Sequence, residues 1–209
     1  TRTTSRNLLI IAITLALVGA AALGTYLASR QRRGLPSPGT DAYEQTVRHF
    51  YRGLAGLQVG LVDAARQEFV QASELAPGEP AVWANLGLAY LRLGDFDAAA
   101  PAVERARALA PTSSQIAFLA GRLETSRGRR DEGIASLRRA VELDPRGLQV
   151  RTALIQEVEN AGGPDADAEA QRLLEELFAL QPDNAAVLVE RARLAAKRGD
   201  VTLLQDSVT

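Results

Sequence analysis

The sequence has no cysteine and only one histidine, His49. Without cysteine the chain cannot form a disulfide, a thiolate metal site or a covalent haem attachment. A lone histidine has no partner ligands, and its place in a helical packing pattern favours a half-buried structural role. Glycine-rich phosphate loops and catalytic motifs are also missing from the sequence. The sequence therefore predicts a protein that is not an enzyme, with no catalytic, cofactor-binding or metal-binding residues.

Acidic residues are absent from the first 40 positions, which hold five of the 24 basic residues and none of the 25 acidic ones. The rest of the chain is consequently mildly acidic, which argues against nucleic acid as a partner. Asp165, Asp167 and Glu169 alternate in this part, but they lack the spacing of a calcium loop. Acidic residues at the start of a helix are the simpler interpretation of these three positions.

Charge of either sign is missing from residues 8–28, which are mostly apolar. A run of about 20 such residues is long enough to cross a bilayer as a helix, and a cleavage pattern of small residues is poor after it. We expect residues 1–29 to form a tail and an uncleaved transmembrane helix in membrane lipid. Residues 30–40 then form a Gly/Pro linker. Basic residues flank both sides, but the short tail favours an extracytoplasmic, periplasmic position for the domain after the linker.

Small residues recur at every fourth position of this run. A row of small side chains lets another helix approach closely within lipid, although alanine and glycine are also simply common in such helices. The predicted packing positions are Ala12, Ala16, Ala20, Gly24 and Ala28.

Prolines mark a regular repeat in the rest of the chain. Pro77, Pro111 and Pro145 follow one another at a constant interval of about 34 residues, here called the repeat period, and each closes a similar phrase. A constant interval of this size indicates stacked helix pairs. The middle unit has Trp83, Leu86, Gly87 and Tyr90 on one helical face, followed by Ala99, Val103, Ala106 and Pro111. This pattern resembles the tetratricopeptide repeat, W-x2-L-G-x2-Y followed by A-x3-F-x2-A and P, with Val103 in place of the aromatic.

The resemblance implies an all-α solenoid of about four and a half helix-turn-helix units over residues 41–209. The expected units are residues 46–79, 80–113, 114–147, 148–184 and an incomplete 185–209. Pro182 stands three positions later than the repeat period places it, so we expect three inserted residues in the turn between the two helices of the fourth unit. We also expect Trp83 to be a buried core residue, and a capping box of Asp41 and Glu44 to begin the first helix early.

The resemblance also implies a concave groove that binds protein segments and is lined by fixed positions of each first helix. Family members that clamp a peptide carboxylate use Lys and Asn there, whereas Phe50 and Leu54 occupy two of those positions here. The groove is thus expected to be apolar in the first two units and polar in the third. The positions are Val47, Phe50, Leu54 and Leu57, then Ala81, Ala84, Leu88, Leu91 and Arg92, then Gln115, Phe118, Arg122 and Thr125.

Three functions remain open at this stage. The chain is a membrane-anchored scaffold or accessory subunit that binds other protein subunits of a membrane complex. Alternatively it is an assembly or chaperone-like factor for membrane or exported proteins. In a third interpretation it is the N-terminal repeat part of a larger exported protein. Whatever protein co-purifies with the chain in mild detergent would separate these three.

Overall fold

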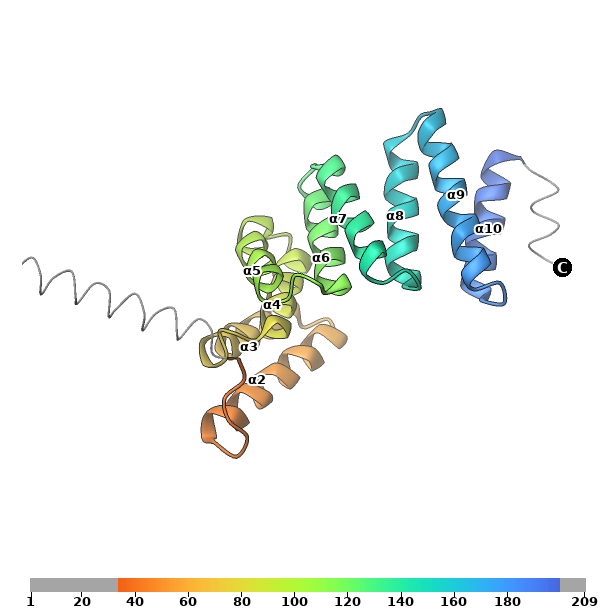
Figure 1. Ribbon diagram of the computed structural model, residues 1–209. Coiled ribbons are helices and arrows are strands. Elements are labelled where there is room, and N and C mark those ends of the chain that lie inside the picture. The colour runs from red at the N-terminus through yellow and green to blue at the C-terminus, as the bar shows by residue number, and fades with distance from the viewer. Residues whose placement is uncertain (1–33, 200–209) are drawn as a thin grey trace, which may run out of the picture. The chain divides into compact units, whose positions relative to one another are not determined.

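The computed structural model describes residues 34–199, and this range contains nine α-helices and no strand (Figure 1). The helices are joined by short turns. In chain order they are α2 (Asp41–Gln58), α3 (Val62–Leu75), α4 (Pro80–Leu93), α5 (Phe96–Leu109), α6 (Ser114–Ser126), α7 (Arg130–Leu143), α8 (Leu148–Ala161), α9 (Pro164–Leu180) and α10 (Ala185–Arg198).

The predicted membrane span at residues 8–28, with its small-residue positions, lies outside the described residues. Within residues 34–199, none of the helices is both long enough and apolar enough to cross a bilayer.

The repeat period reappears in the geometry of the helices. Helices α4, α6 and α8 begin at Pro80, Ser114 and Leu148, so each start lies one repeat period after the one before. The turns inside successive helix pairs contain Gly60, Gly94 and Gly128, with φ angles of 82°, 75° and 79°. Residues with a side chain rarely take a positive φ, so glycine is the residue suited to these turns.

Side-chain caps fix several helix starts, and one of them differs from expectation. Asp95 accepts a hydrogen bond from the Ala98 amide at 3.0 Å, so it ends the turn after Gly94 and begins α5. At α2, however, the cap is Thr40, whose hydroxyl accepts a hydrogen bond from the Tyr43 amide. The expected capping box of Asp41 and Glu44 is therefore wrong, because Asp41 is already the first residue inside the helix.

The three inserted residues of the fourth unit lengthen a helix rather than a loop. Helix α9 has 17 residues, whereas α7 has 14, and only Gly162 and Gly163 separate α8 from α9. Both glycines have positive φ angles, which terminates α8. Pro164 then stands at the start of α9, where the fixed φ of proline suits the first turn and its missing N–H costs nothing. The expectation of an enlarged turn is therefore wrong.

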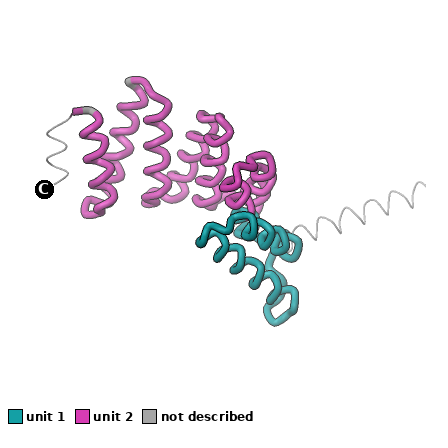
Figure 2. The backbone as a smooth tube through the Cα atoms, turned by 180° about the vertical axis from the view of Figure 1, so that it is seen from behind, with its two compact units in different colours: residues 1–85 teal, residues 86–209 magenta. Residues whose placement is uncertain are grey.

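The described residues divide into two compact units, 34–85 and 86–199, with the boundary inside α4 (Figure 2). In the first unit, α2 packs along α3, and Gly53 of α2 lies against Phe69, whose side chain is fully buried. A Cβ at position 53 would come within 2.6 Å of the Phe69 ring. Glycine therefore allows α2 to approach the aromatic ring closely.

In the second unit, each helix from α5 to α10 packs against the next. The glycine contact of the first unit recurs here, since a Cβ on Gly87 or Gly121 would lie 2.7 Å from Val103 or Leu137. Gly87 therefore stands where two helices cross closely. In the fourth pair, Ile155 replaces the glycine. A continuous core of buried aliphatic side chains then joins α7 to α10, and its least exposed members include Leu137, Leu154, Ile155, Leu174, Leu177 and Leu194.

Candidate functional site

A groove of the second unit lies between α6 and α8 and has a volume of about 550 Å³. Leu137 of α7 contributes to its lining. Most of the remaining lining side chains are polar, which distinguishes the groove from the aliphatic core beneath it. Helix α6 supplies Phe118, Arg122, Thr125 and Ser126, and helix α8 supplies Gln149, Thr152, Ala153, Gln156 and Glu157. We call this surface the α6–α8 groove.

Helix periodicity and the repeat together place these side chains in one groove. On α6, Phe118, Arg122 and Thr125 are separated by four and three residues, so they share one face of the helix. Thr152 and Gln156 of α8 follow Phe118 and Arg122 by one repeat period, so they occupy the same face of the next first helix. Two equivalent faces therefore border one groove.

Arg122 is the cationic side chain of the α6–α8 groove. Its guanidinium carbon lies 5.9 Å from the centre of the Phe118 ring, and among the described residues no carboxylate forms an ion pair with it. Glu157, at the other side of the groove, has a carboxylate oxygen 3.8 Å from Nε of Arg130 on α7. The groove thus offers a solvent-exposed guanidinium together with amide and hydroxyl groups, which suits hydrogen bonding to a peptide.

The predicted groove residues fall into different environments. Phe118 and Arg122 line the α6–α8 groove together, and Thr125 joins them. Leu57 and Leu91 are only 7% and 8% exposed, so each is part of a core and presents little surface. Leu54, Ala84 and Leu88 are half-buried, and Arg92 is exposed.

Phe50 lies in a separate pocket of the first unit, with a volume of about 290 Å³. Val47 and Ala81, two further predicted positions, line the same pocket. The Phe50 ring meets the rings of Tyr51 and Phe69 edge-on, at 5.9 Å between ring centres in both cases. Tyr43 and Leu35 also line this pocket, so the linker and the start of α2 cover part of the apolar surface.

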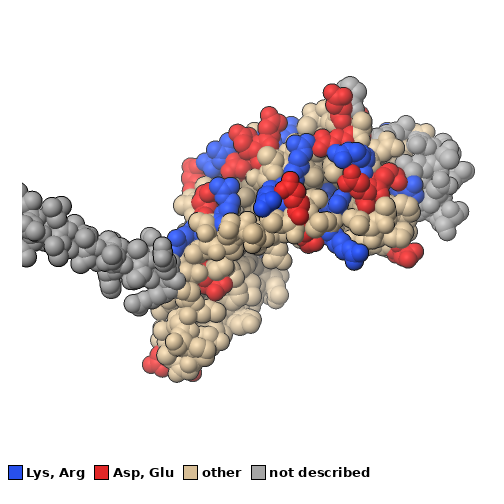
Figure 3. Space-filling model, in the orientation of Figure 1, with Lys and Arg blue, Asp and Glu red and all other residues tan. Residues whose placement is uncertain are grey.

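Charge is distributed unevenly between the helices. On the face shown in Figure 3, basic and acidic side chains alternate over the second unit, whereas the lower part of the first unit, around α2, is mostly uncharged. On this face the second unit therefore presents a mixed charged surface, and the lower part of the first unit presents few charges.

Glu159 is a buried carboxylate at the end of α8, with a side chain only 4% exposed. Burial by itself raises the pKa of this carboxyl, but hydrogen bonds and charges from Arg193 and Lys197 outweigh burial and hold the pKa below its ordinary value. The two distances are 2.5 Å to Arg193 and 3.2 Å to Lys197. Reciprocally, the hydrogen bonds to Glu159 and Glu190 raise the pKa of Arg193. This ion cluster fastens α10 to α8.

The comparison with known families fits this arrangement of helix pairs. Residues 84–147 match the family model of the tetratricopeptide repeat. That stretch, which contains α5, α6, α7 and part of α4, is similar to the tetratricopeptide repeat. No curated protein matches the chain significantly.

Solved structures show a similar fold at low sequence identity, among them a tetratricopeptide repeat (TPR) domain. Pseudomonas aeruginosa pilF has a TM-score of 0.68 at 19% identity, over 80% of this chain and 75% of that one. A MamA fragment from Desulfovibrio magneticus RS-1 has a TM-score of 0.59 at 24% identity, over 66% and 78% of the two chains. The first TPR of Spaghetti (RPAP3), bound to the HSP90 peptide SRMEEVD, has a TM-score of 0.55 at 19% identity, over 61% and 100%.

The residue at the Trp position of the TPR pattern differs from repeat to repeat. Trp83 is half-buried rather than fully buried as expected, because its indole reaches back over the preceding turn, where Nε1 donates to the Pro77 carbonyl at 2.9 Å. His49 holds the position one repeat earlier, with Nδ1 2.6 Å from a carboxylate oxygen of Glu68. Within residues 34–199, no cluster of three or more His, Asp or Glu side chains could hold a metal ion.

Sequence reasoning missed the α8 side of the groove. The signal was available, since one repeat period carries Gln115, Phe118 and Arg122 onto Gln149, Thr152 and Gln156. All three of these α8 residues line the groove, whereas Gln115 does not.

Proposed function

We propose that this chain is a protein-interaction scaffold that binds a segment of a partner protein in the α6–α8 groove. The proposal rests on the groove of about 550 Å³ between α6 and α8. In this groove Arg122 is exposed beside Phe118, and among the described residues it has no carboxylate partner. A segment with a carboxylate side chain would complement this cation, and its backbone amides would complement the hydroxyl and amide groups of the wall. A TPR structure with a bound peptide among the similar folds supports this use of the fold.

The proposal includes attachment to a membrane through residues 8–28, with the repeats on the extracytoplasmic side. Support comes from the absence of charge throughout this run and from the short tail before it. A tethered scaffold of this kind would hold a partner subunit close to the bilayer, as an accessory part of a membrane complex.

Site-specific photocrosslinking in native membranes tests the groove. A photoreactive phenylalanine at Thr152, in the groove wall, should capture a discrete partner, because the residue at this position would contact a bound segment. The matched control is the same residue at Ala179, an exposed position of α9 that does not line the groove. Arg122→Glu should lower the yield of the Thr152 crosslink at least tenfold, because it reverses the charge facing the segment.

A second control tests whether the loss of crosslinking depends on the position of the charge change. Arg146→Glu makes the same charge change at an exposed turn position outside the groove, so the crosslink at Thr152 should persist. Equal crosslinking from Thr152 and Ala179, or equal loss with Arg122→Glu and Arg146→Glu, would overturn the proposed binding site.

A further inference from the structure

A second cavity of the TPR region opens between α5, α6 and α7 and shares no residue with the α6–α8 groove. Its volume is about 230 Å³. The lining is mainly apolar and includes Ala110, Pro111, Ile116, Ala117 and Ala120. Arg107 of α5 and Arg139 of α7 also line it, each with a side chain 55% exposed. We call this cavity the Ala117 pocket.

The pocket exists because the third repeat has two small residues where the second has large ones. Ala117 stands one repeat period after Trp83, and Ala120 stands one repeat period after Leu86. Both alanines are buried, at 9% and 6% exposed, so the space beside them is walled by protein. The pocket is therefore the volume left when an indole and an isobutyl group are missing from a repeat.

Neighbouring repeats show what a large side chain does at this position. Trp83 donates from Nε1 to the carbonyl of Pro77, six residues earlier, at 2.9 Å. Arg151, the equivalent residue of the fourth repeat, donates from Nε to the carbonyl of Pro145, also six residues earlier, at 2.6 Å. The equivalent carbonyl of the third repeat belongs to Pro111, which lines the pocket, and the side chain of Ala117 has no donor to reach it.

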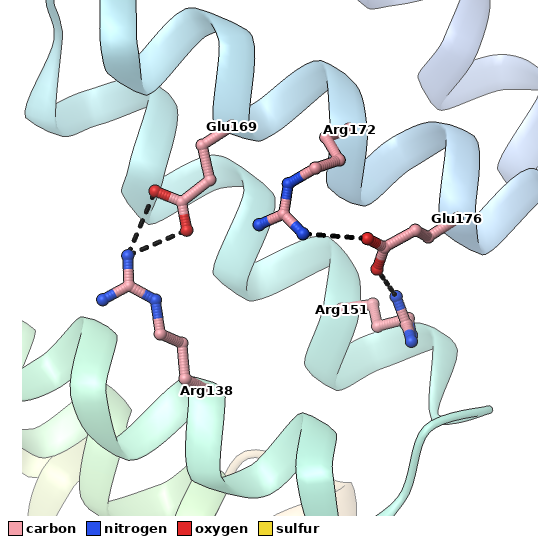
Figure 4. A network of polar contacts seen from close by, with 5 residues as sticks. All are labelled: Arg138, Arg151, Glu169, Arg172 and Glu176. Carbon is pink, nitrogen blue, oxygen red and sulfur yellow. Dashed lines mark hydrogen bonds and ion pairs between the residues drawn. The ribbon is translucent and has the colours of Figure 1, made fainter.

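The charged neighbours differ between position 151, which holds an arginine, and position 117, where the pocket opens. Arg151 also lies 3.5 Å from Glu176, which itself pairs with Arg172 at 3.0 Å (Figure 4). In the third repeat the residue equivalent to Glu176 is Arg139. A cation entering the Ala117 pocket would meet Arg139 and Arg107, each of which already pairs with a glutamate of its own helix, whereas the face of a neutral aromatic ring attracts a guanidinium.

We propose that the Ala117 pocket takes a tryptophan side chain of a partner protein, with the indole N–H donating to the carbonyl of Pro111. The ring would occupy the volume that Trp83 occupies in its own repeat, and Arg139 and Arg107 would lie near its edge or face. Because the pocket and the α6–α8 groove share no residue, this inference does not depend on the proposed function.

The first experiment titrates the full chain with N-acetyl-L-tryptophanamide and follows the methyl NMR signals of Ala117, Ala120 and Ala135. Saturable shifts confined to these methyls are expected. The 1-methylindole analogue of the probe should bind about five- to tenfold more weakly, because it cannot donate to Pro111. Shifts with free indole but none with the amide would mean a small-molecule site and would overturn the proposal, as would equal binding of the methylated analogue.

Two variants, Ala117→Trp and Ala135→Leu, close the pocket in different ways. Ala117→Trp restores the residue of the second repeat and should fill the pocket from within, which abolishes the shifts of Ala120 and Ala135. Ala179→Trp adds the same indole at an exposed site of α9 and should leave binding intact. If Ala117→Trp does not fold, Ala135→Leu serves instead, because position 135 is exposed at the pocket and a larger side chain there narrows the mouth. Unchanged probe binding in a folded closing variant would overturn the assignment.

Discussion

The side chain of Thr125 on α6 fills the space beside Gly133 of α7. A Cβ on Gly133 would lie 2.3 Å from the Thr125 methyl and 3.1 Å from the Gly121 carbonyl oxygen. The repeat pattern favours alanine at this position, and glycine replaces it here because the neighbouring threonine is β-branched. Local packing thus explains why glycine replaces the alanine of the repeat pattern at position 133. The sequence alone shows the replacement but not its cause.

This crowding predicts a background-dependent substitution. Gly133→Ala should lower the free energy of unfolding by about 1–2 kcal/mol, since overpacking outweighs the ~1 kcal/mol that alanine gains in a helix. In a Thr125→Ser background the methyl at 2.3 Å is gone and only the backbone contacts near 3.1 Å remain, so the same change should cost clearly less. Urea denaturation followed by circular dichroism measures both. An equal cost in the two backgrounds would show that Thr125 is not the obstacle.

Sequence reasoning reached the environments of single residues only in part. The close approach at Gly87 was predictable, because a glycine on an otherwise apolar helical face is typical of helices that cross closely. The half-buried state of Trp83 was not, since it depends on the indole reaching back to the Pro77 carbonyl. Leu57 and Leu91 were expected to face a groove, yet both are buried. The spacing of residues predicts which side chains share one face of a helix. It does not predict how completely a neighbouring helix buries that face.

At the scale of one element, α10 depends on charged contacts as well as on its buried Val187 and Leu194. Arg193 and Lys197 bond Glu159 of α8, and Arg191 bonds Glu175 of α9 at 3.0 Å. The Arg191 guanidinium also lies 4.2 Å from the centre of the Phe178 ring. Such contacts weaken with salt and with protonation of the carboxylates, unlike the aliphatic core of α7–α9.

The Glu159 cluster predicts a pH dependence of stability. Because the folded-state pKa of Glu159 is below its ordinary value of 4.5, its stabilisation is present above that pH and is lost as the pH falls through the folded value. Glu159→Gln should cost about 1–2 kcal/mol at pH 7, since both cationic partners are about half exposed, and less at pH 3, where the carboxylate is closer to protonation. Urea denaturation at the two pH values measures this difference.

Glu157→Gln is the matched control on the same helix, since Glu157 lies 3.8 Å from an exposed Arg130. Its cost should stay below about 0.5 kcal/mol at both pH values. If both variants lose the same free energy of unfolding at pH 7, burial does not make the ion pairs of Glu159 stronger than an exposed pair, and the prediction is wrong.

Element boundaries show a similar division between what is predictable and what is not. The turn glycines and the repeat period allowed α4, α6 and α8 to be expected from sequence. The three extra residues before Ala170 were expected in a loop, but Pro164 starts the helix early and α9 absorbs them. A proline followed by acidic residues is a helix-start signal, and it outweighs the tendency of insertions to fall in loops.

At the scale of the whole molecule, the α6–α8 groove and the Ala117 pocket are each lined by residues of two adjacent repeats. Their lining residues were partly predictable, because the period transfers a position from one repeat to the next. Their volumes were not, because each depends on which neighbour is small, as with Ala117 and Ala120. Sequence therefore predicts where a groove runs more readily than where a pocket opens.

Membrane attachment is a prediction for the whole chain. Leu17→Arg with Val18→Arg places two charges in the middle of residues 8–28, at about 2.5–3.5 kcal/mol each. The unaltered chain should stay in the membrane pellet after carbonate extraction, and the double variant should appear in the supernatant. Leu35→Arg, an exposed position outside this run, is the control and should remain in the pellet. Equal distribution of all three proteins would contradict the anchor.

The glycine contacts Gly53–Phe69, Gly87–Val103 and Gly121–Leu137 have a consequence for recombination between repeats. Each pair lies inside one helix hairpin, and the side chain facing the glycine differs in volume from hairpin to hairpin. A crossover at the turn inside a hairpin would give a glycine a partner sized for another core. A crossover at the prolines between hairpins keeps every pair intact. Chimeras joined near Pro111 or Pro145 should therefore express and fold more often than chimeras joined near Gly94 or Gly128.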